Sequence, residues 1–266
     1  PENNRNIPVI PQILGNSPED FIHLARVIAD LGYGTVNWNL GCPHSKVAKK
    51  RRGSGLLPWP DDIDAFLDAV MGKISCGLSL KVRLGRGDGS EIFRLLPVLD
   101  NYPLDEIIVH PRTGVQMYTG VADVDAFDRI RKQTRHVLVY NGDITGPGFF
   151  GTVQTRFPEI RRFMIGRGVL ANPFLPSQIK GTSRDFGQDL DVLRAFHDDL
   201  FGEYCRFLKS PIHLTGRMKG IWSFLALSFD DCHKALKRIH KSEQVRDYTA
   251  AVDLFFHGKP RFNPQL

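Results

Sequence analysis

The sequence predicts an α/β fold: a TIM (β/α)8-type barrel whose first two βα units are absent from this chain, followed by a small α-helical domain. Three observations support this. Short apolar runs rich in Val and Ile alternate with segments of helical periodicity over roughly the first 170 residues. Each run stops on polar or glycine-rich residues, as strands of such a barrel do where they enter its functional loops. Beyond about residue 180, helical periodicity continues without a further strand.

Six segments have the composition expected of strands that are buried on both faces of a parallel sheet. They cover residues 8–14, 34–40, 78–84, 106–110, 136–140 and 162–165. A closed barrel of this type needs eight βα units of roughly 30 residues each, so about 60 residues are expected to be missing at the front.

Helices are expected between these strands. Ser17 is a candidate N-cap, and Pro18 and two acidic residues follow it in the first turn. Apolar residues then recur at helical spacing until Gly32 ends the helix; they are Phe21, Leu24, Ala25, Ile28 and Leu31. Further helices are expected over residues 60–70, 90–99 and 123–133.

The last third of the chain has a different pattern. Residues Gly181, Thr182, Ser183 and Arg184 are typical of a linker. Two apolar series at helical spacing follow it: Leu193, Phe196, Leu200, Tyr204 and Leu208, and then Val245, Tyr248, Val252 and Phe255. The chain therefore divides into a barrel, residues 1–180, and a helical domain, residues 181–266.

Composition narrows the function classes. With 42% hydrophobic and 24% charged residues, the 266-residue chain is typical of a globular protein. It has no apolar run of membrane-spanning length, and its first five residues are polar and lack the apolar core of a secretory signal. The four cysteines are scattered, which favours neither a metal site nor a disulfide framework and indicates a reducing, cytoplasmic compartment.

The net charge of +6 is localised. Residues 206–266 contain 11 Lys and Arg against 5 Asp and Glu, and 11 − 5 = 6, so the rest of the chain is balanced. This excess indicates an anionic partner, although a solvated basic surface explains it equally well.

Residues at the strand ends could carry chemistry. Cys42 follows a strand end within Asn39-Leu40-Gly41-Cys42-Pro43, where a tight turn can expose its thiol as an acid or nucleophile. Lys81 and His110 should point into the barrel mouth, where an unpaired lysine usually serves a ligand or an ion pair. For His110 alone, a structural role is equally plausible.

Two glycine turns and one basic loop suggest anionic ligands. The turns Asn141-Gly142-Asp143 and Gly166-Arg167-Gly168 end consecutive strands, where barrels of this type commonly bind phosphate. Residues 46–52 contain five Lys and Arg directly after the candidate catalytic cysteine. A polyanionic substrate at the mouth explains that cluster better than a solvated loop.

Five motifs follow one another at these strand ends. They are Gly41-Cys42-Pro43 with Lys46-Val47 and Gly53…Leu56-Leu57; Lys81-Val82-Arg83-Leu84-Gly85; Val109-His110-Pro111-Arg112-Thr113; Asn141-Gly142-Asp143-Ile144; and Met164-Ile165-Gly166-Arg167-Gly168. In order and spacing they resemble the tRNA-dihydrouridine synthase family over about residues 8–175. The chain is most similar to the bacterial branch that is associated with position 16 of the D-loop.

The resemblance implies an enzyme that reduces the C5=C6 bond of a uridine in tRNA, with FMN as cofactor and NADPH as electron donor. Reduced flavin would deliver a hydride to C6, and Cys42 would protonate C5 as general acid. The implied contacts are Asn39 with the uracil; Gln12, Lys81 and His110 with the flavin ring and ribityl chain; Asn141, Gly142, Asp143, Gly166 and Arg167 with the ribityl-phosphate end; Arg112 with FMN or RNA; and Arg217 and Lys219, in the helical domain, with tRNA. A monomer without metal or membrane contact is expected.

The chain departs from the family pattern at three places. A first strand with a Pro-Met flavin contact is not visible, Arg51 and Arg52 replace frequent glycines, and Pro111 replaces the glycine of His-Gly-Arg-Thr. Two alternatives remain at this point: an FMN barrel oxidoreductase acting on a small pyrimidine, and a tRNA-binding barrel without catalysis.

Overall fold

The computed structural model describes residue 4, residues 6–182 and residues 190–263. By its internal contacts, the chain divides into two compact units. Unit 1 comprises Pro1–Gly142 and Pro158–Met164, and unit 2 comprises Asp143–Phe157 and Ile165–Leu266. Residues 143–157 and 165–180 thus pack with the later helices, whereas the division expected from sequence groups them with the strands.

Unit 1 is built on a parallel sheet. Within the described residues it has six strands in sequential order: β1 (Gln12–Ile13), β2 (Thr35–Leu40), β3 (Gly77–Gly85), β4 (Ile107–Thr113), β5 (Leu138–Tyr140) and β6 (Arg162–Phe163). The predicted strands and the α/β barrel-type architecture are therefore confirmed. The edge strands β1 and β6 are shorter than expected, and each pairs with only one neighbour.

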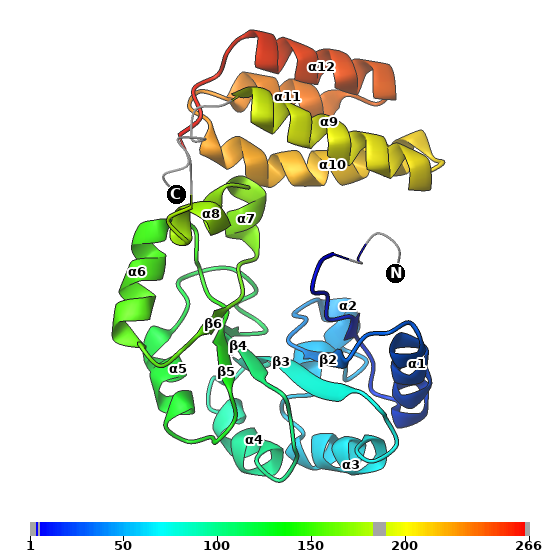
Figure 1. Cartoon of the computed structure of the whole chain (residues 1–266), viewed down its shortest axis with the longest axis vertical. Coiled ribbons are helices and arrows are strands. Elements are labelled where there is room, and N and C mark those ends of the chain that lie inside the picture. Colours follow the sequence, from blue (N-terminus) through cyan, green and yellow to red (C-terminus); the bar gives the residue numbers. More distant parts are fainter. Residues whose placement is uncertain (1–3, 5, 183–189, 264–266) are drawn as a thin grey trace. The chain divides into compact units, whose positions relative to one another are not determined.

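Helices cover the outer side of this sheet (Figure 1). They are α1 (Pro18–Asp30), α3 (Pro60–Val70), α4 (Glu91–Leu99) and α5 (Val124–Arg131). Two short elements, α2 (Ser45–Ala48) and the 3-10 turn η2 (Gly53–Gly55), lie in the segment between β2 and α3, and η2 contacts β2 and β3. As predicted, the Ser17 hydroxyl caps α1 by accepting the Asp20 N–H. The buried stripe of α1 is narrower than expected: Phe21 and Ala25 are buried, but Leu24 and Leu31 are exposed.

The sheet register separates polar from apolar side chains. Gln12 aligns with Asn37, and Asn37 aligns with Ser79, so polar residues share one face. On the opposite face, Trp38 is fully buried and stacks on Phe66 of α3, with ring centroids 3.8 Å apart. Aromatic side chains therefore pack α3 against the outer face of the sheet, and the polar side chains lie on its inner face.

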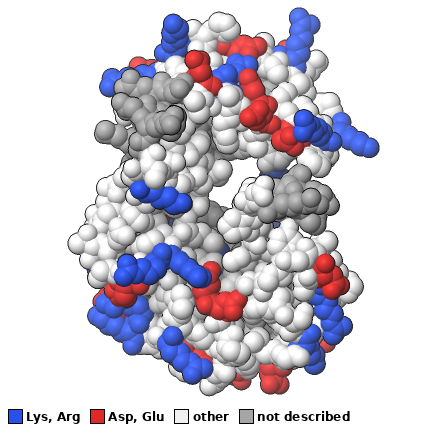
Figure 2. Space-filling model, in the orientation of Figure 1, with Lys and Arg blue, Asp and Glu red and all other residues white. Residues whose placement is uncertain are grey.

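Unit 2 is helical. Its elements are α6 (Pro147–Arg156), α7 (Arg167–Ala171), α8 (Leu175–Ile179), α9 (Leu190–Phe207), α10 (Pro211–Leu225), the 3-10 turn η4 (Ala226–Ser228), α11 (His233–Lys241) and α12 (Val245–His257). The predicted helical C-terminal region is confirmed, although Ser183 and Arg184 of the predicted linker lie outside the described residues. On the face shown in Figure 2, basic side chains lie mostly at the margins of α9–α12, with acidic ones between them.

An aromatic core with a polar centre holds α9–α12 together. Trp222 Nε1 donates to the Tyr248 hydroxyl, and the His197 Nε2 atom lies 2.6 Å from the same oxygen. The periodicity predicts Phe196 on the inner face of α9, but Phe196 is exposed and His197 is buried. His197 replaces an apolar side chain there because Tyr248 and Asp198 satisfy both ring nitrogens.

Candidate active site

Cys42 lies on a turn whose backbone is held from two sides. Its N–H and that of Gly41 both donate to Asn39 Oδ1, at 2.9 and 3.0 Å. The Ser54 N–H and hydroxyl both donate to the Cys42 carbonyl. Gly53 packs against this turn with φ +55°, and a Cβ atom there would lie 2.7 Å from Cys42 Cβ. The half-buried free thiol of Cys42 is therefore presented by a fixed backbone.

A chain of amide hydrogen bonds supports Asn39. Its Nδ2 atom donates to Gln12 Oε1 at 2.6 Å, and Gln12 Nε2 donates to Asn37 Oδ1 at 2.7 Å. Asn37 Nδ2 in turn donates to the hydroxyl of buried Ser79. The structure thus brings together Gln12, Asn39 and Cys42, three of the residues predicted for the site.

Lys81 is the neighbour of Asn39 in the sheet register. Burial, assisted by the positive charge of Arg83, lowers its pKa to about 8. In the part of the chain that the structure describes, no acceptor lies within hydrogen-bonding distance of its Nζ atom. This ammonium is shielded from water and fits an electron-rich or anionic ligand.

His110 and Arg112 lie on the same face of β4 and contact each other. Arg112 Nη1 is 3.1 Å from His110 Nε2, and because a guanidinium only donates, that nitrogen must accept and the ring proton lies on Nδ1. Arg112 is 2% exposed and also donates to the carbonyls of Thr119 and Gly120. Its clearest role is to hold the loop after β4; the predicted contact with FMN or RNA stays a prediction.

Two further arginines, Arg83 and Arg86, donate hydrogen bonds to the loops at the strand ends. Neither of them was assigned a role from the sequence. Buried Arg83 donates to the carbonyls of Gly41, Thr113 and Met117 at 3.0, 2.8 and 2.6 Å. Arg86 donates to the carbonyl of Pro43. For Arg83 there was a signal: alternation along the strand places it on the same face as Lys81.

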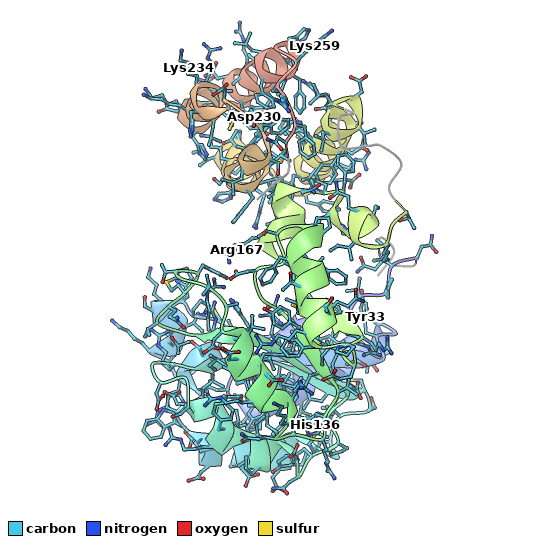
Figure 3. The ribbon with its side chains drawn as sticks, turned by 90° about the vertical axis from the view of Figure 1, so that its left-hand side faces the viewer. Tyr33, His136, Arg167, Asp230, Lys234 and Lys259 are labelled. Carbon is cyan, nitrogen blue, oxygen red and sulfur yellow. The ribbon has the colours of Figure 1, made fainter. Side chains whose placement is uncertain are left out.

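The residues predicted for the phosphate end fall into both units. In unit 1, Asn141 Nδ2 donates to the Met164 carbonyl, and a Cβ atom at Gly142 would lie 2.9 Å from the Tyr140 hydroxyl oxygen. In unit 2, Asp143 pairs with Arg167 at 3.1 Å, and Gly166 is the N-cap of α7. Figure 3 labels Arg167. That these residues form one phosphate site stays a prediction.

The two predicted tRNA contacts of α10 differ in their surroundings. Arg217 is exposed and lines a shallow cavity of about 490 Å³. Lys219 is half-buried, and its Nζ atom donates to the Ser242 carbonyl at the end of α11. Lys219 also lines a second cavity, of about 820 Å³, between α10 and the start of α12. Arg217 is therefore the more accessible of the two.

The described ranges contain no group of three or more His, Cys, Asp or Glu residues that could hold a metal ion. In the same ranges, no helix is long and apolar enough to cross a membrane.

Comparisons with known proteins agree with the motifs. The family model described as "Dihydrouridine synthase (Dus)" matches residues 1–254. Similar curated proteins are tRNA-dihydrouridine synthases B from Pasteurella multocida (30% identity; 62% of this chain and 49% of that protein), Proteus vulgaris (29%; 64% and 52%) and Yersinia pestis (28%; 64% and 53%). The chain spans about half the length of these relatives. A solved structure of histamine dehydrogenase from Rhizobium sp. 4-9 aligns with a TM-score of 0.48 and 14% identity, over 62% of this chain and 27% of that one.

Proposed function

The chain belongs to the dihydrouridine synthase family, and from this premise we propose that it reduces uridine to 5,6-dihydrouridine in the D-loop of tRNA. The observation that carries the proposal is the Cys42 turn: a thiol on a backbone fixed by Asn39 and Ser54. Its neighbour across the strands is the shielded ammonium of Lys81. A small-pyrimidine oxidoreductase would not need the basic loop beside this turn.

We propose that the polar inner face of unit 1 binds FMN. Gln12, Lys81 and His110 would contact the ring system and ribityl chain, since Lys81 offers a cation that the described residues leave without an acceptor. Asn141, Gly142, Asp143, Gly166 and Arg167 would surround the phosphate. Once bound and reduced by NADPH, the flavin would supply the hydride for C6 of the substrate.

Cys42 would supply the proton. A uracil that leaves its stack would approach the Cys42 turn, and the Cys42 thiol would donate to C5 as general acid. Asn39 already uses Oδ1 to hold the turn and Nδ2 to hold Gln12. To contact the uracil, Asn39 would have to give up its hydrogen bond to Gln12 or share Nδ2 between the two. The main role of Asn39 would therefore be to position Cys42.

The two parts of the chain would divide the work. Residues 1–180 would carry FMN and catalysis, and residues 181–266 would hold the folded RNA through its backbone and shape. Arg217 would contact tRNA directly, and Lys219 would contribute through the cavity that it lines. We expect a monomeric cytoplasmic enzyme.

Substitution of the cysteine tests this function. Cys42→Ala should keep flavin absorbance and tRNA binding but lose most dihydrouridine formation, a fall of about 100-fold or more for a missing general acid. Cys205→Ala, which removes an exposed thiol from α9, is the matched control and should be fully active. Full activity of Cys42→Ala would refute the role of Cys42. A wild-type protein that binds tRNA without flavin absorbance would instead indicate a non-catalytic RNA-binding protein.

A further inference from the structure

A ridge of cations follows the Cys42 turn. It comprises Lys46, Lys49, Lys50, Arg51 and Arg52, which we call the basic ridge. The three lysines are exposed, and across the described residues none of them has an acidic partner. No acidic residue interrupts the segment from His44 to Trp59. The uncompensated charge of the three lysines favours a polyanion.

The basic ridge is mechanically coupled to Cys42. The Ser54 N–H and hydroxyl bind the Cys42 carbonyl, and Gly53 allows the two segments to touch. On the other side, Arg52 Nε donates to Asn16 Oδ1, and Asn16 Nδ2 donates to the Lys50 carbonyl. A ligand on the ridge would therefore lie on the same rigid segment as the catalytic thiol.

Arg51 and Trp59 form an exposed stack on this segment. The Arg51 Cζ atom lies 4.0 Å from the Trp59 ring centroid, and Asp62 fixes the guanidinium with an ion pair of 3.1 Å. Trp59 nevertheless remains 45% exposed. Arg51 has φ +50°, a left-handed conformation that is unfavourable for a side chain other than glycine. The chain therefore keeps an arginine where glycine would be less strained.

We propose that the basic ridge binds the phosphates of the RNA strand that carries the target uridine, and that a neighbouring nucleobase stacks on the Arg51–Trp59 pair. The proposal rests on the proposed function and names the substrate contact beside Cys42. Phosphates suit the lysines, and unstacked RNA bases bind to aromatic rings and guanidinium planes. An acidic protein would use the lysines but gain nothing from an exposed, arginine-backed indole.

Tryptophan fluorescence isolates the stacking contact. The chain has three tryptophans, and Trp38 and Trp222 are 0% and 1% exposed, so a base that stacks on protein should quench chiefly Trp59. Substrate tRNA should quench the wild type but not Trp59→Phe. Inorganic polyphosphate and poly-glutamate serve as anions without bases and should not quench. Equal quenching of both proteins by tRNA, or quenching by polyphosphate, would overturn the stack.

A glycine variant separates binding from structure. Arg51→Gly removes backbone strain and an exposed ion pair of little worth, so its Tm should not fall. It should raise the KM for tRNA about tenfold, because loss of a stacked base commonly costs at least that much. A lower Tm with an unchanged KM would show that Arg51 is structural and would contradict the proposal.

Neutralising the three lysines and measuring the salt dependence of tRNA binding tests their role. Lys46→Gln, Lys49→Gln and Lys50→Gln together should lower the slope of log K against log[salt] by about 2–3, as expected for three lost phosphate contacts. The control replaces Lys73, Lys132 and Arg135, exposed residues near the opposite ends of the strands, with Gln. Equal slopes in both triple variants would refute the ridge. If the wild type forms no dihydrouridine, the proposed function fails instead, whatever the slopes.

Discussion

At the scale of the residue, Lys81 is under unusual physical constraint. Its folded-state pKa of about 8 lies below the ordinary value of 10.5, so the unfolded chain binds the proton more tightly. Below pH 8 the shielded charge lowers the free energy of unfolding by its full amount. This destabilisation disappears as the pH rises toward 10.5. Lys81→Met, of similar volume, should therefore raise the Tm by roughly 3 °C or more at pH 7 without flavin, and the gain should vanish near pH 10.5.

Flavin should reverse the comparison at Lys81. A ligand raises the Tm of a protein more when it binds more tightly. Because the wild type should bind FMN more tightly than Lys81→Met does, saturating FMN should raise the Tm of the wild type more than that of the variant. Thermal unfolding at several pH values, with and without FMN, measures both effects. A variant that is less stable than the wild type at pH 7 without FMN would show that Lys81 has a stabilising partner.

Individual residues also show what the sequence could and could not predict. The predicted strand ends imply that Gln12, Asn39 and Cys42 lie near one another, because strand ends of a parallel sheet share one edge, and the structure links them by hydrogen bonds. The sequence could not predict the hydrogen-bond partners of their polar atoms. Arg112 and Lys219 both use donors on carbonyls of their own unit, and such contacts depend on loop paths that no periodicity encodes.

At the scale of the element, Arg83 joins the ends of β2 and β4 to the loop after β4. Lysine would keep the charge but lose the planar fork that reaches three carbonyls at once. Arg83→Lys should lower the free energy of unfolding by about 2–4 kcal/mol, because buried carbonyls lose their donor. Denaturant unfolding measures this, and activity should fall as the Cys42 turn loosens.

Arg129→Lys is the matched control for Arg83. Arg129 is exposed on α5 and lies 4.5 Å from the Phe93 ring centroid. Its replacement by lysine should change the free energy of unfolding by no more than about 0.5 kcal/mol. Equal losses in the two variants would mean that the three carbonyl contacts of Arg83 contribute nothing specific.

Elements with a full hydrophobic repeat were predictable, and short ones were not. The helices α1, α3, α4 and α5 lie where capping residues and apolar spacing predict them. By contrast, α2, α7 and α8 have four or five residues each, too few to display a helical period. These short helices carry or adjoin Lys46 and Arg167, so the least predictable elements lie among the candidate functional residues.

At the scale of the whole molecule, the charge pattern gives two separate basic surfaces. One is the basic ridge of unit 1. The other is the outer face of α11, where Lys234, Lys237, Arg238 and Lys241 recur at helical spacing and are exposed (Figure 3 labels Lys234). Among the described residues none of these four has an ion-pair partner. The opposite side of α11 packs Ile239 into the aromatic core, so this orientation is fixed.

If both surfaces hold the same tRNA through phosphates, their contributions to binding should add. Replacing the four α11 cations with Gln should lower the salt slope by about 3–4, and combining this with the ridge triple should lower it by about 5–7. The binding free energies should add within about 0.5 kcal/mol, because the sites share no side chains. Filter binding of substrate tRNA at several salt concentrations tests this, with the Lys73, Lys132 and Arg135 triple as control. An α11 variant with unchanged slope would show that the basic face of α11 is a solvated surface and not an RNA contact.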